Sequence, residues 1–329
     1  MALVPSVTTP AAAPPTQTRS AHTRGKGSSS FLFGRRLTAQ VTFAVGLSLV
    51  VVFSLAPSVG ILAISFTDIR SLPFLPVQWV GLENYKTFFS AAHLGYNLHA
   101  LKNTFVFAFA VTLFQNTLAL LIAVLFNMRL RGRNVFRAVV FAPTILGVTV
   151  IGLIFSLIFN PSGGPAASVW SLFGSGSAFF GDPHLAMTLV IFVQVWSGIG
   201  VAVVIYLAGL QAISAELYEV ASIDGASAWQ KLRLVTFPLL APSVTANTLL
   251  CIIGSLQSYQ LIYVLTGPEN PATQVLSLAI FAQGFGGSST GGAVQSQGYA
   301  AAISIVQFVL VMIISLGMLT YLRKRETTL

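Results

Sequence analysis

Charged residues are scarce in this chain of 329 residues, since Asp, Glu, Lys and Arg together make up 8% of it while 55% is hydrophobic. The mean hydropathy is +0.82. A soluble domain carries roughly a quarter charged residues, so this composition is not that of an ordinary water-soluble protein. It indicates a chain whose main solvent is lipid.

Cysteine, histidine and acidic residues are also few: one, four and eight, respectively. The single cysteine, Cys251, lies in an apolar stretch and has no partner for an intrachain disulfide, so we expect it to pack as a small apolar side chain. The sequence has no glycine-rich phosphate loop ending in Gly-Lys-Ser or Gly-Lys-Thr. We therefore expect a chain that is not an enzyme, with no cofactor and no metal of its own.

Long hydrophobic runs are abundant. A helix needs about 20 mostly apolar residues to cross a hydrocarbon core of about 30 Å. Six runs qualify, at 41–66, 104–126, 136–159, 185–208, 239–265 and 298–322. Pro57 and Pro143 are expected to kink the first and third runs without breaking them. The sequence predicts an all-α membrane domain of six transmembrane helices over 36–329, preceded by a disordered tail over 1–35.

The basic residues set the orientation of these spans. Of the 17 Lys and Arg residues, only Arg70, Lys86 and Lys102 fall on the side of the first loop. The rest lie in the two terminal segments and in the second and fourth loops, which the positive-inside rule places in the cytoplasm. The net charge of +9 is thus a topology signal and does not indicate a nucleic-acid partner.

No charged or histidine side chain is expected at mid-membrane depth. Such residues mark proton relays, so their absence argues against a proton-coupled carrier, although sodium coupling through backbone carbonyls stays open. A charged solute in a low-dielectric path would need a countercharge. The spans therefore favour a neutral, polyhydroxylated solute. A charged solute such as glycerol phosphate remains the alternative, with its countercharge in a partner subunit.

Uncharged polar side chains do occur within the predicted spans. Amides and phenols beside aromatic faces suit sugar recognition, because they donate and accept hydrogen bonds while a ring stacks on C–H groups. The candidates for a solute path are Gln194, Trp196, Ser255, Gln257, Tyr259 and Gln260. The alternative is that these residues join helices by hydrogen bonds. For the cluster over 255–263, both interpretations remain open.

The fourth loop, 214–242, predicts a compact helix–turn–helix on the cytoplasmic face, between the fourth and fifth spans. Residues 214–223 favour a short helix capped by Ser214, and Asp224-Gly225 favours a turn. A second helical piece follows from Ala226, and prolines mark the return to the membrane. An amphipathic loop lying on the lipid surface is the alternative.

The same loop resembles the EAA loop of ABC importer permeases. The matching positions are Glu219, Ala221, Asp224, Gly225, Ala226, Pro238 and Pro242. The segments 65–67, 80–85 and 263–268 resemble the carbohydrate-uptake branch, which is related to the maltose-transporter permease. Tyr259-Gln260 and Gly267-Pro268 depart from that branch, which often has Phe-Asp and Gly-Gly-Pro there.

The resemblance implies a multi-pass permease subunit in a bacterial plasma membrane, with both termini cytoplasmic. It would pair with a second homologous permease, dock two cytoplasmic ATPases that bind ATP and Mg, and receive solute from an extracytoplasmic binding protein. The residues implied in ATPase coupling are Glu219, Ala221, Asp224, Gly225, Ala226, Lys231 and Pro238. The expected function is ATP-driven import of a neutral sugar or oligosaccharide. An ion-coupled carrier and a membrane scaffold are competing hypotheses from different classes of protein.

Overall fold

The computed structural model describes residues 40–70, 76–128, 132–172, 176–286 and 296–326. The expected disordered tail lies outside these residues. In the described part the chain is helical apart from turns, extended linkers and two isolated β-bridges. Four of the described helices are long and apolar enough to cross a membrane, and the number reaches six if each of two bent helix pairs is one span. The helical fold class is confirmed.

The first apolar helix, Gln40–Ile64, contains one π-helical turn, η1 (Val51–Leu55), followed by α2 (Ala56–Ile64). The N–H of Ala56 donates to the carbonyl of Val51. Pro57 follows directly, and a proline has no N–H and crowds the turn before it, which accounts for a local bulge in place of a break. The chain divides after Ser58 into two compact units.

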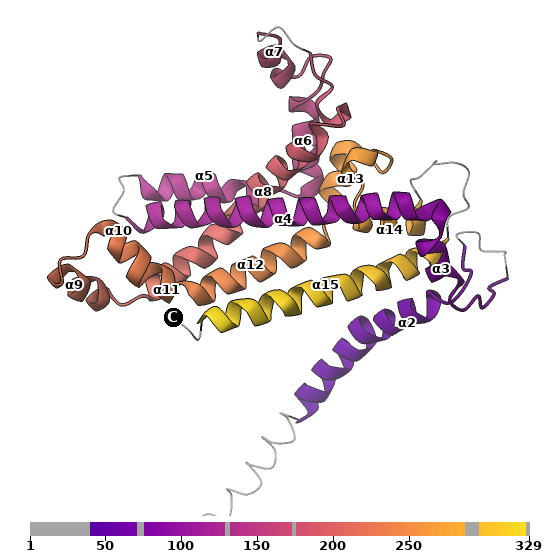
Figure 1. Ribbon diagram of the computed structural model, residues 1–329, viewed down its shortest axis with the longest axis horizontal. Helices are drawn as coiled ribbons and strands as arrows, with labels where there is room; N and C mark the ends of the chain where they lie inside the picture. The colour runs from indigo at the N-terminus through magenta and orange to yellow at the C-terminus, as the bar shows by residue number, and fades with distance from the viewer. Residues whose placement is uncertain (1–39, 71–75, 129–131, 173–175, 287–295, 327–329) are drawn as a thin grey trace, which may run out of the picture. The chain divides into compact units, whose positions relative to one another are not determined.

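The second unit is built on four helices. These are α4 (Ala91–Asn127), α8 (Ala186–Ala212), α12 (Ala241–Leu256) and α15 (Gln297–Glu326). α4 packs against α8 and α12, and α12 packs against α15 (Figure 1). Glycine allows close approach between α8 and the start of α12: a Cβ at Gly209 would lie 2.8 Å from Leu240 Cδ1. Small residues at helix contacts are typical of membrane bundles.

The third predicted span is broken. α5 (Arg133–Ile145) and α6 (Val148–Ile158) meet at an angle of 101°. Pro143 lies inside α5, and the break falls three residues later, at Leu146 and Gly147, whose backbones are extended. The expectation of a continuous helix kinked at Pro143 was therefore wrong. The turn carries α6 onto α13 (Gln260–Thr266), where Gly152 lies against Val264.

The fifth predicted span, 239–265, is also not one helix. α12 ends at Leu256, and α13 starts at Gln260 after an irregular stretch. At the other end of α12, the segment Ala228–Leu239 runs into it with a bend of 65°. In a membrane, a broken helix is tolerated where other parts of the protein satisfy the freed backbone groups.

The expected outer loops contain helices. They are α3 (Glu83–Phe89), α7 (Pro165–Ser171), the 3₁₀ turns η2 (Phe179–Gly181) and η4 (Pro271–Thr273), and the buried apolar helix α14 (Leu276–Phe285). α4 also begins at Ala91, well before the predicted position 104. The described parts of these expected outer loops are thus more helical than hydropathy alone indicates, because helices of this length are too short to register as spans.

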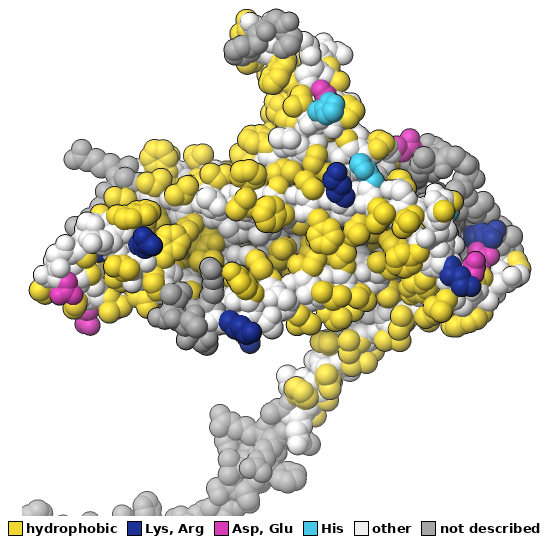
Figure 2. All heavy atoms as spheres, viewed as in Figure 1, with side chains coloured by type: hydrophobic (Ala, Val, Ile, Leu, Met, Phe, Trp, Pro, Cys, Tyr) yellow, Lys and Arg dark blue, Asp and Glu magenta, His cyan; other side chains and the backbone are white. Residues whose placement is uncertain are grey.

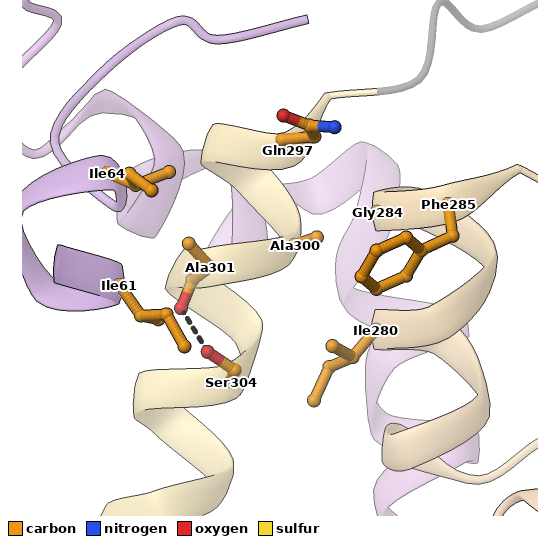
Figure 3. Close-up of a pocket in the computed structure, with 9 residues that line it drawn as sticks. All are labelled: Ile61, Ile64, Ile280, Gly284, Phe285, Gln297, Ala300, Ala301 and Ser304. Atoms are coloured by element: carbon orange, nitrogen blue, oxygen red, sulfur yellow. Dashed lines mark hydrogen bonds between the residues drawn. The ribbon is translucent and has the colours of Figure 1, made fainter. Parts of the chain in front are cut away.

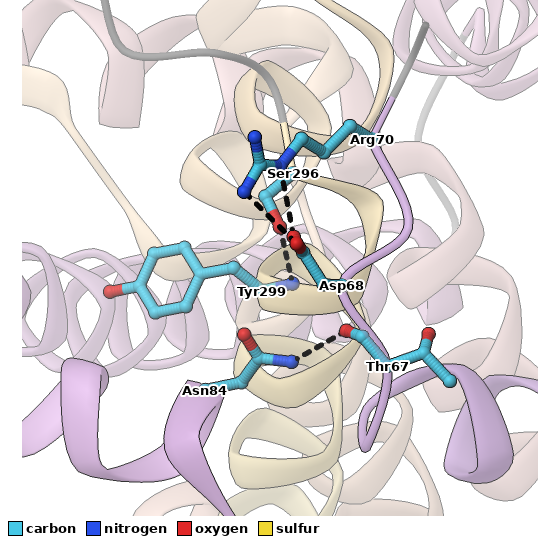
Figure 4. A network of polar contacts seen from close by, with 6 residues as sticks. All are labelled: Thr67, Asp68, Arg70, Asn84, Ser296 and Tyr299. Atoms are coloured by element: carbon cyan, nitrogen blue, oxygen red, sulfur yellow. Dashed lines mark hydrogen bonds and ion pairs between the residues drawn. The ribbon is translucent and has the colours of Figure 1, made fainter. Parts of the chain in front are cut away.

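A polar strap joins the end of α2 to the start of α15 (Figure 4). The Asn84 amide donates to the carbonyls of Ser65 and Thr67, at 2.9 Å each. Arg70 pairs with Asp68 at 2.9 Å and forms a β-bridge with Ser296. These bonds hold two helix ends together that are more than 200 residues apart in sequence.

Candidate functional site

The loop over 214–242, predicted to be cytoplasmic, folds as a helical hairpin. α9 (Ala215–Ile223) begins at Ser214, whose hydroxyl accepts from the Glu216 N–H at 3.3 Å. The chain then turns at Gly225, which has φ +74°, a conformation that favours glycine. The predicted first helix, its cap and its turn are confirmed.

The second piece begins at Ala228, two residues later than expected. α10 (Ala228–Lys231) starts with a capping box: the Ser227 hydroxyl accepts from the Gln230 N–H, and the Gln230 side chain accepts from the Ser227 N–H at 2.7 Å. A π-helical turn, η3 (Leu232–Thr236), and α11 (Phe237–Leu239) follow. Pro238 and Pro242 each lie in the first turn of a helix, where the missing N–H costs nothing.

Hydrogen bonds join the two arms of the hairpin. The Lys231 ammonium donates to the Ser222 hydroxyl at 2.6 Å, and this hydroxyl donates to the Tyr218 carbonyl. The Tyr218 hydroxyl lies 3.0 Å from that of Thr236. The two arms are therefore tied together by side chains, and the second arm leads into α12.

The outer surface of this hairpin combines exposed apolar and acidic side chains. Ile223 is 85% exposed, and Trp229 and Leu234 are each 67% exposed. Glu219 and Asp224 are exposed and form no ion pair with any residue that the structure describes. Figure 2 shows acidic side chains at the α9 end of the molecule. Exposed apolar side chains rimmed by charge mark a site of interaction with another protein or with the membrane surface.

The structure brings only part of the predicted solute path together. The Ser258 hydroxyl donates to the Gln194 side-chain oxygen at 3.4 Å, which links α8 to the break after α12. Trp196 instead packs edge-on against Phe155, with ring centroids 5.1 Å apart. Ser255 is buried. Gln194 thus lies beside the break, whereas Trp196 lies against Phe155 and Ser255 is buried; their part in a solute path stays a prediction.

An aromatic cluster lies next to the break. Tyr259 stacks on Phe281 of α14 with ring centroids 5.0 Å apart, and Tyr263 meets the same ring edge-on at 5.2 Å. Gln257 and Gln260 are exposed at either side of Tyr259. Phe281 was missed in the sequence analysis because it falls in a predicted outer loop. The sequence feature that could have identified this helix is the short apolar run Leu276–Phe285.

The break itself is closed by hydrogen bonds. The Leu256 carbonyl accepts from the Ser277 hydroxyl at 3.1 Å and from the Gln307 amide at 3.0 Å. α14 is also held at its start, where the Thr104 hydroxyl accepts from the Leu276 N–H at 2.9 Å and Asn103 donates to the Gln274 carbonyl. Side chains from α4 and α15 thereby fix α14 beside the aromatic cluster.

A pocket of about 280 Å³ lies on another side of α14 (Figure 3). Its lining is mostly apolar and includes Ile61, Ile280, Phe285 and Ala301. The hydroxyl of Ser304, which also lines it, already donates to the Ala301 carbonyl at 2.7 Å. The pocket offers a sugar few hydrogen-bond partners and is not our candidate solute site. In the described part of the chain, no group of three or more His, Cys, Asp or Glu side chains is arranged to hold a metal ion.

Comparisons with known proteins agree with this architecture. The family of binding-protein-dependent transport system inner membrane components matches residues 115–327. The trehalose/maltose transport system permease protein MalF of Thermococcus litoralis is 34% identical over 270 residues, covering 81% of this chain and 87% of that protein. The arabinooligosaccharides transport system permease protein AraP of Bacillus subtilis is 32% identical over 275 residues, covering 80% and 82%.

A solved structure shares the fold. It is that of a bacterial ABC transporter involved in the import of the acidic polysaccharide alginate. The TM-score is 0.76 at 22% identity, over 90% of this chain and 98% of the other. The chain therefore belongs to the family of binding-protein-dependent transport system inner membrane components.

Proposed function

We propose that this chain is the permease subunit of an ATP-driven ABC importer that moves a neutral sugar or oligosaccharide into the cell. The observation that carries the solute class is the stacked pair Tyr259 and Phe281 beside the exposed amides of Gln257 and Gln260. Aromatic faces with adjacent amides bind sugars, because rings stack on C–H groups while amides pair with hydroxyls. Two relatives carry sugar-transport names, which supports the same class.

The side chains of this cluster favour a transported solute without charge. Its polar members, including Gln194 and Ser258, are uncharged amides and hydroxyls. A phosphate or carboxylate held there would leave its charge without a partner in a medium of low dielectric. A neutral, polyhydroxylated solute avoids that cost, and its hydroxyls match the donors and acceptors offered.

Energy enters through the hairpin of α9 and α10. Each of two ATPases, which bind ATP and Mg, docks on one permease, and here the contact surface includes Glu219, Asp224, Ile223 and Trp229. The remaining coupling residues act inside the hairpin: Gly225 makes its turn, Lys231 joins its arms, and Ala221 and Ala226 keep it narrow. Pro238 begins the connection to α12, so a push on the hairpin reaches the solute path.

The chain works as one half of a membrane channel. It is a multi-pass protein of the bacterial plasma membrane, surrounded by lipid, with α5–α6 as the third of six spans and α12 as the fifth. Both termini are cytoplasmic, in agreement with the distribution of Lys and Arg. A second homologous permease completes the path, and an extracytoplasmic binding protein delivers the sugar.

Reconstitution tests this function. Proteoliposomes would hold this chain with its partner permease and ATPase, the binding protein would be added outside, and uptake of labelled oligosaccharides would be measured. We expect uptake that requires ATP, is reduced by competing neutral sugars and is unaffected by phosphate esters. Competition by phosphate esters alone would contradict the neutral class. Uptake by this chain without the ATPase would contradict the importer.

A further inference from the structure

The break after α12 is closed by a ring of three hydrogen bonds. The Gln307 amide donates one hydrogen to the Leu256 carbonyl at 3.0 Å and the other to the Ser277 hydroxyl at 2.7 Å. The Ser277 hydroxyl in turn donates to the same carbonyl at 3.1 Å. Both amide hydrogens, the hydroxyl hydrogen and both lone pairs of the carbonyl are used. α12, α14 and α15 meet at this point, which we call the ring joint (Leu256, Ser277 and Gln307).

The ring joint is buried and carries a cost. Leu256 is 1% exposed, and Ser277 and Gln307 are 7% exposed. The side-chain oxygen of Gln307 is buried and has no hydrogen-bond partner among the described residues. A buried polar atom without a partner is unfavourable, so an apolar residue that left the carbonyl to Ser277 alone would avoid that penalty. The free energy of folding therefore does not explain the presence of glutamine at position 307.

The place of the ring joint in the fold explains why a glutamine is found at position 307. Ser277 and Phe281 are four residues apart on α14 and so lie on the same face of that helix. Phe281 stacks on Tyr259, only three residues after Leu256. A displacement of the end of α12 is thus passed by the ring joint to the helix that carries Phe281. Without the joint, α12 and α14 would be connected only by packing against α15 and by the chain through the irregular stretch 257–259 and α13, which could absorb the motion.

We propose that Gln307 is a positioning residue. It couples the distance between the Tyr259 and Phe281 rings to the movement of α12, and hence to the movement of the cytoplasmic hairpin. This rests on the proposed function, because the hairpin must be driven by an ATPase. α12 is a rod of 16 residues without an internal break, and it begins directly after the hairpin. The ring joint is its far end. A solute held by the aromatic pair is released when α12 moves α14 relative to α13.

A labelling experiment tests the proposal in the assembled complex. In a Cys251→Ala background, Gln260→Cys places a reporter thiol at the exposed side of the break. Its reaction with a membrane-impermeant maleimide is measured without nucleotide and with ATP plus vanadate. We expect the rate to change at least about fivefold between the two states, the scale of one buried hydrogen bond, and to change less than twofold after Gln307→Met. Methionine keeps the length of glutamine but cannot donate.

Matched variants complete the test. Ser304→Ala, on the same helix, removes a hydroxyl that bonds only within α15 and should leave the reporter response intact. Ser277→Ala should weaken the response, and combining it with Gln307→Met should add nothing further, since both remove the same joint. An unchanged nucleotide response in Gln307→Met overturns the proposal. If that variant does not assemble, an unchanged response in Ser277→Ala overturns it.

Uptake separates this inference from the proposed function. Uptake is measured with the chain that keeps Cys251 and Gln260, because Gln260 belongs to the proposed solute site. If this chain takes up sugar with ATP but the Gln260→Cys reporter with Gln307 intact does not respond to nucleotide, the ring joint proposal fails and the importer stands. If the reporter responds as expected but no neutral sugar enters, the joint stands and the solute class fails.

Discussion

The Lys231 ammonium lies 2.6 Å from the Ser222 hydroxyl, across the turn at Gly225. The family resemblance implies a role for Lys231 in ATPase coupling. The geometry gives it a bond inside the hairpin, because the same Ser222 hydroxyl is tied to the Tyr218 carbonyl at 2.6 Å. A lysine that joins α9 to α10 stiffens the surface that a partner would push.

Replacing Lys231 by Met should therefore loosen the hairpin without unfolding the protein. One exposed hydrogen bond to a charged group is worth about 1 kcal/mol, so backbone amides of α9 should exchange hydrogen roughly fivefold faster. Hydrogen exchange followed by mass spectrometry measures this in detergent or nanodiscs. Arg233→Met is the control, because it removes a neighbouring exposed positive charge from η3. Equal effects of both variants would show that charge alone is responsible.

Gly225→Val should uncouple ATP hydrolysis from uptake. The φ of +74° strains any other residue, at about 1–2 kcal/mol, while an added Cβ would meet nothing within 4 Å. The turn would shift to relieve that strain and α9 would be re-aimed. We expect normal membrane insertion with uptake reduced about tenfold. Gly317→Ala serves as the control, because its site on α15 is also open and its φ is not positive. Unimpaired uptake by Gly225→Val would refute the role of the turn.

Glu219→Lys should weaken ATPase docking. The carboxylate is exposed and forms no ion pair with a described residue, so it is available to a basic group of a partner. Reversing its sign turns attraction into repulsion, and we expect the dissociation constant of the ATPase to rise at least about tenfold. Glu83→Lys, at an exposed site on α3, should leave docking unchanged. Binding of the purified ATPase to nanodiscs decides the question; equal affinities would exclude Glu219 from the interface.

The hairpin was predictable because its signals are local. Ser214 precedes a helix-forming run, Gly225 permits the positive φ of the turn, and Pro238 and Pro242 fit first turns. Each of these is a property of one residue and its neighbours in sequence. Apolar length similarly predicted the helical membrane architecture.

The break at 257–259 was not predictable in that way. No proline or glycine lies in it, and its polar residues Gln257, Ser258 and Tyr259 are equally compatible with a continuous helix that carries a solute site. The helix ends at Leu256 because Ser277 and Gln307, distant in sequence, satisfy its freed carbonyl. The bend after α5 has the same origin, since α6 departs to pack on α13. Contacts with residues distant in sequence thus determine where both helices break.

Phe281→Ala tests the candidate solute site directly. The ring stacks on Tyr259 and meets Tyr263 edge-on, so its loss removes the centre of the aromatic cluster that we propose for sugar binding. Aromatic pairs are worth about 0.5–1.5 kcal/mol beyond their burial, so we expect the sugar concentration at half-maximal uptake to rise between about twofold and tenfold. Basal ATP hydrolysis should stay within about twofold, because the hairpin is untouched.

Two matched variants sharpen this test. Tyr259→Phe keeps the stacked ring and removes only a hydroxyl, so it should change the half-maximal concentration less than Phe281→Ala does. Phe308→Ala removes an equally large ring from α15, where it is 63% exposed, and should leave sugar uptake unaltered. If Phe308→Ala impaired uptake as much as Phe281→Ala, the loss would reflect general packing. An unaltered concentration dependence in Phe281→Ala would remove the aromatic cluster from the solute path and leave the amides of Gln257 and Gln260 as its only candidates beside the break.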